Sequence, residues 1–153
     1  MLVRVFIIFV FSALLVSSCH SPAPCFNKNM ENVSLKWGSF NDKDNSYDGY
    51  VLSPTGLLQK YYRDSAGVER SRNITYISHE KVCKVLNYYY WVMKKVQTCY
   101  EPGNNLKYLI FDNAHYNTSW RAVWNENFNT GSNKYLKVVF DSLRTVTNGI
   151  EKE

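Results

Sequence analysis

The histidines and carboxylates of this 153-residue chain are the side chains able to carry out acid–base chemistry. Neither His79 nor His115 stands in a metal-binding spacing such as His-Glu-x-x-His. The chain also lacks a Gly-x-Ser-x-Gly nucleophile motif and a glycine-rich phosphate loop. We therefore expect a protein that is not an enzyme. The alternative is a hydrolase of unfamiliar type that uses His115 with loop carboxylates.

Oxygen-bearing side chains alternate along the segment Asp42–Asp48, a pattern that can wrap a calcium ion. The match to an EF-hand loop fails at two positions, because Tyr47 replaces the glycine and Ser53 replaces the final glutamate. We favour a solvated acidic turn, and weak calcium binding stays open.

The four cysteines, Cys19, Cys25, Cys83 and Cys99, form no Cys-x-x-Cys motif. Cys83 and Cys99 are sixteen residues apart, and this pair has no histidine at a companion spacing. The sequence therefore predicts no metal and no cofactor. A continuous helix from Cys83 to Cys99 would separate their Cα atoms by about 24 Å, whereas a disulfide needs about 7 Å or less. We predict instead a Cys25–Cys99 disulfide, which would tie the N-terminal segment to the domain.

The first residues have the organisation of an export signal. Arg4 precedes an apolar run, Val5–Val16, that is shorter than the roughly 20 residues needed to span a bilayer. The run ends in Val16-Ser17-Ser18-Cys19, which resembles the bacterial lipobox. That resemblance implies a signal peptide over residues 1–18 and a lipid anchor on Cys19. It also implies a lipoprotein of the cell envelope that faces the periplasm or the cell surface.

An ordinary secretory signal cut near Ser18 or Ala23 is the alternative, and it would give a secreted protein. The even number of cysteines favours this alternative, because two disulfides use all four. Acylation of Cys19 would leave three cysteines, of which one stays unpaired.

The composition indicates one domain over residues 32–153, joined to the anchor by a tether over residues 19–31. Removal of residues 1–18 takes away Arg4 and lowers the net charge from +5 to +4; this charge is spread out, with no block of five like charges, so we expect no nucleic-acid partner. Twelve tyrosines and four tryptophans suit half-buried sheets and binding surfaces.

Alternating apolar residues predict four strands in a meander. The expected strands are Val33–Trp37, Tyr47–Ser53, Leu57–Arg63 and Arg70–Ile77. Between the second and third, proline sets the first turn angle and glycine accepts a positive φ in Pro54-Thr55-Gly56, which predicts a hairpin.

Apolar residues then recur at three- and four-residue steps from Val82 to Val96, which predicts a helix with Ser78 as N-cap. The run Tyr88–Val92 favours a strand by propensity. A second hairpin, Leu106–Asn113 with Ser119–Asn125, and a helix over Leu136–Val146 follow. We predict an α+β fold with an antiparallel sheet of about six strands and two helices on one face.

Exposed aromatic residues beside lysines are typical anchors of protein interfaces. Lys84, Tyr88, Trp91 and Lys95 share one stripe of the first predicted helix, and His115 and Tyr116 lie at the tip of the second hairpin. We predict that these six residues bind a protein partner. The alternative for Trp91 is that it packs beneath a neighbouring loop.

The anchor and the order of hairpins and helices resemble small bacterial lipoproteins, including protease inhibitors of the emfourin group. The glycine-rich strand of that group is not reproduced, since Tyr47-Asp48-Gly49-Tyr50 keeps one glycine, so no inhibitory residue is transferred. The resemblance implies a membrane-anchored, protein-binding role that includes protease inhibition. A structural component of the envelope is a further alternative.

Overall fold

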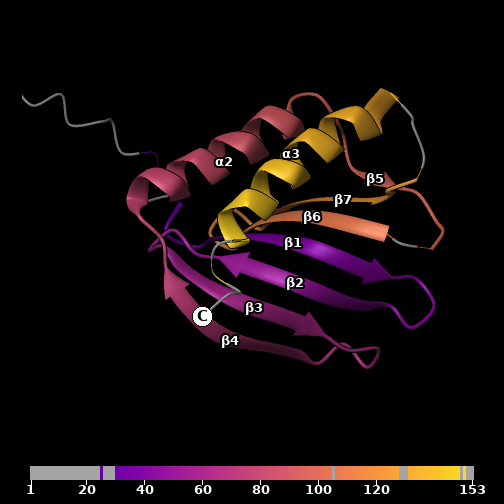
Figure 1. Ribbon diagram of the computed structural model, residues 1–153, viewed down its shortest axis with the longest axis horizontal. Coiled ribbons are helices and arrows are strands. Elements are labelled where there is room, and N and C mark those ends of the chain that lie inside the picture. The colour runs from indigo at the N-terminus through magenta and orange to yellow at the C-terminus, as the bar shows by residue number, and fades with distance from the viewer. Residues whose placement is uncertain (1–24, 26–29, 105, 128–130, 149, 151–153) are drawn as a thin grey trace, which may run out of the picture.

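The computed structural model describes residues 25, 30–104, 106–127, 131–148 and 150. The predicted signal peptide and Cys19 lie outside the described residues. The elements are β1 (Val33–Asn41), β2 (Ser46–Leu52), β3 (Leu57–Arg63), β4 (Glu69–Tyr76), α2 (His79–Met93), β5 (Cys99–Tyr100), β6 (Leu106–Asn113), β7 (Thr118–Asn125) and α3 (Gly131–Thr147). Figure 1 shows the two helices above one sheet, which confirms the predicted α+β class.

The sheet has seven strands in the order β4-β3-β2-β1-β6-β7-β5. The meander β1–β4 and the hairpin β6–β7 are antiparallel, as predicted. The prediction of about six antiparallel strands missed β5, which pairs in parallel with β7 through Cys99 and Ala122. A two-residue strand is too short to show an alternating pattern in the sequence. Because β5 is parallel to β7, the sheet is mixed rather than purely antiparallel.

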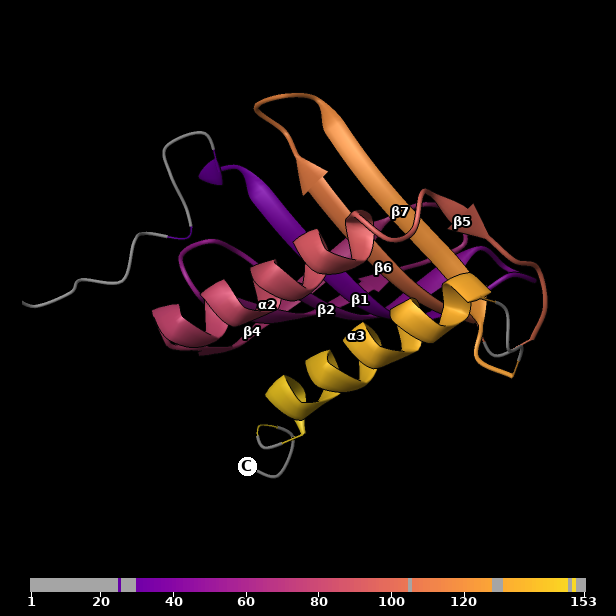
Figure 2. The ribbon, with the colours of Figure 1, turned by 90° about the horizontal axis from the view of Figure 1, so that it is seen from above.

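Helices α2 and α3 lie side by side on one face of the sheet and run in opposite directions (Figure 2). The predicted N-cap forms, because the Ser78 side chain accepts a hydrogen bond from the backbone N–H of Lys81. The strand propensity of Tyr88–Val92 does not prevail, since Tyr89 and Val92 lie on the buried side of α2. Among the described residues, neither helix is long and apolar enough to cross a membrane.

The main core lies between the helices and the sheet. It contains the apolar stripes of α2 and α3 and the alternating side chains of β1, β6 and β7. Trp120 and Trp124 of β7 belong to it, and the Trp124 ring meets Phe140 of α3 edge-on at 5.6 Å between centroids. Burial of Trp120 and Trp124 beneath the helices fixes the register of β7, because a one-residue slip would move both tryptophans to the opposite face of the sheet.

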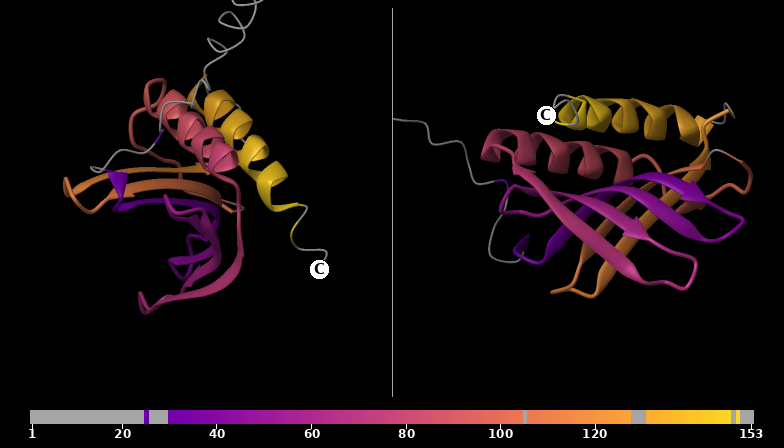
Figure 3. Two further views of the ribbon diagram at one scale, coloured as in Figure 1. Left: turned by 90° about the vertical axis from the view of Figure 1, so that its left-hand side faces the viewer. Right: turned by 60° about the horizontal axis from the view of Figure 1, so that its bottom comes forward.

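The sheet bends, so that the face away from the helices is concave (Figure 3, left). A second, smaller core fills this concave face with Phe40, Tyr47, Tyr61, Leu106, Tyr108 and Val123. Gly38 of β1 pairs with Gly49 of β2. A Cβ atom on Gly49 would lie 2.0 Å from the Trp37 carbonyl oxygen and 2.6 Å from the Tyr108 hydroxyl. Glycine at this position therefore permits the close approach of the β1 backbone and the Tyr108 side chain.

Candidate functional site

The stripe predicted for protein binding lies on the exposed side of α2. Lys84 and Trp91 are exposed, while Tyr88 is half-buried and packs against the main core. Lys95 is exposed too, but it follows the end of α2, where its backbone N–H donates to the Val92 carbonyl at 2.9 Å. The structure thus brings three of the predicted residues together on the helix and places Lys95 in the turn after it.

Trp91 does not pack beneath a loop. Its ring meets Tyr135 of α3 edge-on, with 5.5 Å between centroids, and the side chain remains 40% exposed. Edge-to-face aromatic pairs contribute about 0.5–1.5 kcal/mol beyond the area that they bury. The contact therefore holds an exposed indole at a fixed position between the two helices, where both contribute to one surface.

His115 and Tyr116 lie at the tip of the β6–β7 hairpin, separate from the α2 stripe. The Asn113 side chain caps this tip by accepting hydrogen bonds from the backbone N–H groups of both residues, and Asn117 adopts a φ of 48°. Within the described residues, the His115 ring contacts Tyr116 at 4.7 Å between centroids and has no hydrogen-bond or ion-pair partner. The geometry thus supplies no carboxylate to orient His115 as a catalytic base.

Cys25 forms a disulfide with Cys83, with 5.4 Å between the Cα atoms, so the predicted Cys25–Cys99 pair is wrong. Cys83 lies near the start of α2, whereas Cys99 lies beyond its other end in β5. A continuous 15-residue helix holds the two apart. Cys99 is free and half-buried, and its thiol donates to the Val123 carbonyl. Burial raises the pKa of this thiol, and the negative charge of Glu101 raises it further.

The N-terminal segment therefore joins the domain earlier than residue 32, the predicted domain boundary. Cys25 is bonded to α2, and Met30 packs against the main core and accepts a hydrogen bond from the Tyr90 hydroxyl. His79, the first residue of α2, is exposed and lies beside the disulfide. Its Nε2 atom is 3.5 Å from the Cys83 sulfur and 4.0 Å from the Cys25 sulfur.

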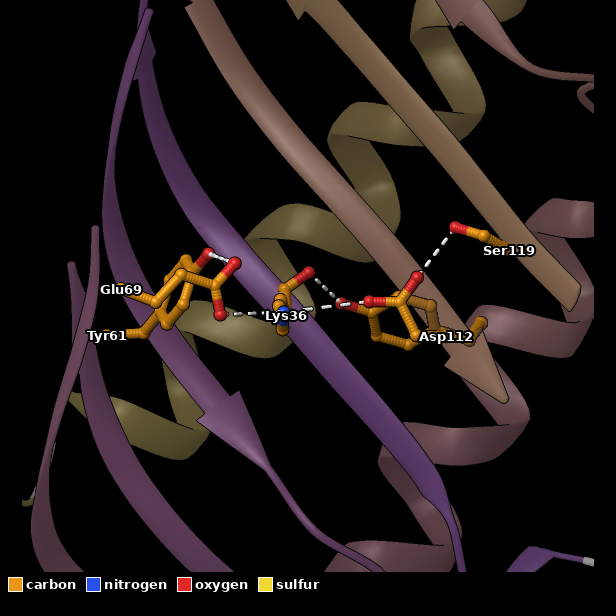
Figure 4. Close-up of polar contacts among 6 residues, drawn as sticks. Lys36, Tyr61, Glu69, Asp112 and Ser119 are labelled. Atoms are coloured by element: carbon orange, nitrogen blue, oxygen red, sulfur yellow. Dashed lines mark hydrogen bonds and ion pairs between the residues drawn. The ribbon is translucent and has the colours of Figure 1, made fainter. Parts of the chain in front are cut away.

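A polar network that the sequence did not reveal crosses the concave face (Figure 4). The Lys36 ammonium lies 3.8 Å from a Glu69 oxygen and 3.6 Å from an Asp112 oxygen. Tyr61 donates to Glu69 at 2.9 Å, and Ser119 donates to Asp112 at 2.6 Å. The Lys36 side chain is 16% exposed, so the two carboxylates compensate a charge that has lost most of its water.

Lys36 also lies over the Tyr61 ring, with its Nζ atom 4.9 Å from the ring centroid. Arg121 covers Phe40 and Tyr47 in the same way. Burial and the hydrogen bond to Glu69 raise the pKa of Tyr61, and burial raises that of Tyr108. These groups stay protonated at neutral pH. The concave face thus combines neutral phenols with compensated charges, which fits a cover over the second core.

A polar cavity of about 490 Å³ lies between the sheet and the end of α3, and its lining includes Trp37, Tyr50, Lys60, Lys107, Arg144 and Asn148. Its lysines already have partners. Lys60 pairs with Asp48 at 3.1 Å, and Lys107 pairs with Glu126 at 3.5 Å. The volume would suit a small molecule, but the paired lysines leave little excess charge to bind an anion.

The acidic segment Asp42–Asp48 spans the turn between β1 and β2 and the first residues of β2. Asp44 accepts a hydrogen bond from the backbone N–H of Ser46, and Asp42 accepts one from the Tyr100 hydroxyl. Asp48 lies beyond this turn, within β2, and pairs with Lys60. The three carboxylates thus each engage protein groups and point to different neighbours, as expected for a solvated acidic turn.

Comparison with known proteins identifies no relative from which a function could be transferred. No family model matches the chain, and neither the curated proteins nor the solved structures include a match.

Proposed function

We propose that this protein is an exported lipoprotein, anchored through Cys19, whose domain binds a protein partner through the outer surface of α2 and α3. The observation that carries the proposal is the exposed Trp91 ring, held against Tyr135 and flanked by Lys84. A rigid aromatic side chain loses little conformational entropy on binding, which is why such residues dominate the energy of protein interfaces.

The charge of this surface specifies the kind of partner. The helices and the two residues after α2 contain Lys81, Lys84, Lys94, Lys95, Lys134, Lys137 and Arg144 against Glu80 and Asp141. This excess accounts for the whole net charge of +5, since acidic and basic residues balance over the rest of the chain. A partner with an acidic surface would associate faster and in a defined orientation. Proteases are the partner class that the emfourin-like layout recommends testing first.

The Cys25–Cys83 disulfide supports the anchored arrangement. If Cys19 carries the lipid, only six residue steps separate the anchor from Cys25, which is bonded to α2. An extended chain of that length reaches about 20 Å. The start of α2 is then kept within about 20 Å of the membrane surface, and a partner would be captured there rather than in free solution.

The test combines intact-mass analysis with binding by matched variants. A diacyl or triacyl adduct on Cys19 supports the anchor, and an unmodified chain cut near Ser18 overturns it. For binding, a partner cross-linked by the wild-type protein should be lost with Trp91→Ala and with Lys84→Glu. The control is Tyr62→Ala, because Tyr62 on β3 is 42% exposed, close to the 40% of Trp91. Equal recovery with the Trp91 and Tyr62 variants would contradict the proposed surface.

Assays against a panel of proteases test whether the protein inhibits a protease. Inhibition that disappears with Trp91→Ala would identify the protein as a protease inhibitor. Hydrolysis of an ester or peptide that disappears with His115→Ala, in a variant that still folds, would instead establish the hydrolase alternative and overturn a purely binding role.

A further inference from the structure

Three groups with metal-binding chemistry meet at the start of α2. His79 and Cys83 are four residues apart on the helix, so their side chains lie on the same face, and Cys25 joins them from the N-terminal segment. The two sulfurs and the His79 ring nitrogen all lie within 4.8 Å of one another. The sequence did not predict this cluster, because Cys25 is 54 residues from His79.

The distances between sulfur and nitrogen already suit a tetrahedral zinc ion. Zinc binds thiolate sulfur at about 2.3 Å and imidazole nitrogen at about 2.0 Å, so tetrahedral angles place the two ligand atoms about 3.6 Å apart. The His79 nitrogen lies 3.5 Å from the Cys83 sulfur and 4.0 Å from the Cys25 sulfur. Only the bonded sulfurs must separate, to about 3.8 Å, once their bond is broken.

We propose that reduction of the Cys25–Cys83 disulfide creates a zinc site formed by both cysteines and His79, with the fourth position open to water. The reductant is a dithiol, which transfers two electrons and two protons to the sulfur pair and leaves as a cyclic disulfide. Each new thiol then releases its proton to solvent as the zinc ion binds the thiolate.

The surroundings allow an ion to enter. His79 is exposed, and the two cysteines are half-buried, so both a reductant and a hydrated cation can reach the cluster. The ligand set of two thiolates and an imidazole favours zinc over calcium or magnesium, which prefer oxygen ligands. The site would thus replace one cross-link between the N-terminal segment and α2 with another. The inference does not depend on acylation of Cys19.

The test uses the full-length protein, reduced with a phosphine that is then removed, and zinc alone as the probe. We expect the reduced protein to bind one zinc ion per chain and the oxidised protein to bind none at this site. His79→Ala should weaken binding at least tenfold, while the control variants His115→Ala and Cys99→Ser should bind like the wild type.

Alkylation mapped by mass spectrometry provides a second measurement that resolves each cysteine. Zinc should protect Cys25 and Cys83 of the reduced protein from alkylation and leave Cys99 unprotected. Binding that survives His79→Ala undiminished, or binding lost with Cys99→Ser, would overturn the proposal, as would a reduced and folded protein that binds no zinc.

Discussion

Two buried tyrosine hydroxyls have opposite environments. Tyr89 of α2 donates a hydrogen bond to the Lys36 carbonyl at 2.5 Å, which joins the helix to β1. Tyr108 of β6 has no hydrogen-bond partner for its hydroxyl among the described residues. Burial raises the pKa of both phenols, so neither ionises at neutral pH. The same chemical change at the two positions should therefore have different consequences.

We predict that Tyr89→Phe lowers the free energy of unfolding by about 1–2 kcal/mol, because it removes the partner of a backbone carbonyl. Tyr108→Phe should leave the free energy of unfolding unchanged or raise it by up to about 1 kcal/mol, since it removes a buried hydroxyl that lacks a partner. Denaturant titration of both variants measures the difference. A larger loss for Tyr108→Phe than for Tyr89→Phe would show that the Tyr108 hydroxyl has a partner, such as a bound water.

The close packing of β1, β2 and Tyr108 leaves no room for a side chain at Gly49. We predict that Gly49→Ala lowers the free energy of unfolding by about 3 kcal/mol or more, because the added Cβ would overlap the Trp37 carbonyl oxygen and the Gly38 Cα atom, which are backbone atoms. Gly131→Ala is the matched control, since its Cβ would have no neighbour within 4 Å. Thermal unfolding of the two variants tests this. Equal melting temperatures would show that this packing does not need the glycine.

At the scale of elements, the spacing of apolar residues predicted the helices and strands that bury one face. The strands β1, β2, β6 and β7 and both helices follow the alternating or helical patterns of their apolar residues. The strand β4 is largely exposed and lies at the sheet edge, yet the alternation over Arg70–Ile77 indicated it as well. The strand β5 could not be predicted, because its only basis is a contact with β7 more than 20 residues away.

The difference between local patterns and contacts between distant segments also separates the site residues that were predicted from those that were not. The spacing of Lys84, Tyr88 and Trp91 is local, so the helix alone places them together. The partners of Lys36 and Cys25 come from distant parts of the chain, and only the bend of the sheet and the position of α2 bring them close. Helix geometry excluded only the Cys83–Cys99 pair, and no local pattern indicated that Cys25 lies beside Cys83 at the start of α2, so the predicted Cys25–Cys99 disulfide was wrong.

The Cys25–Cys83 disulfide closes a loop that contains the whole meander, with a sequence separation of 58 between the two cysteines. Chain-entropy arguments give about 4 kcal/mol for a loop of this length, and measured values of about 2–5 kcal/mol are common. We predict that Cys83→Ser lowers the free energy of unfolding by about 2–4 kcal/mol. Cys25→Ser and the double variant should lose the same amount, because each removes the same bond. Additive losses in denaturant titrations would contradict this pairing.

At the scale of the whole molecule, the helix layer and the concave face divide the surface between them. The excess of basic over acidic residues lies on and beside α2 and α3, whereas on the concave face Lys36 pairs with Glu69 and Asp112. The disulfide lies at one end of the helix layer, so it determines where the N-terminal segment leaves the domain. An anchor on Cys19 would therefore act on the same layer that we propose binds the partner.

For the anchored protein, we predict that the redox state of Cys25 controls the distance between the domain and the membrane. With the disulfide, six residue steps join Cys19 to α2, and a chain of that length reaches at most about 20 Å. In Cys25→Ser the next described attachment is Met30, eleven steps away, which raises the maximum reach to about 37 Å. Neutron reflectometry on supported bilayers measures the expected increase in the distance between domain and membrane.

The comparison that joins the two proposals uses the reduced wild-type protein on the same bilayer. Reduction alone should raise the domain as Cys25→Ser does, because both remove the covalent link to α2. Zinc should then return the reduced wild type to the height of the oxidised protein and leave Cys25→Ser extended, since only the wild type keeps both thiolates beside His79. Cys99→Ser should match the wild type in every state. A domain height that ignores both redox state and zinc would show that other contacts, such as those of Met30, hold the segment to the domain.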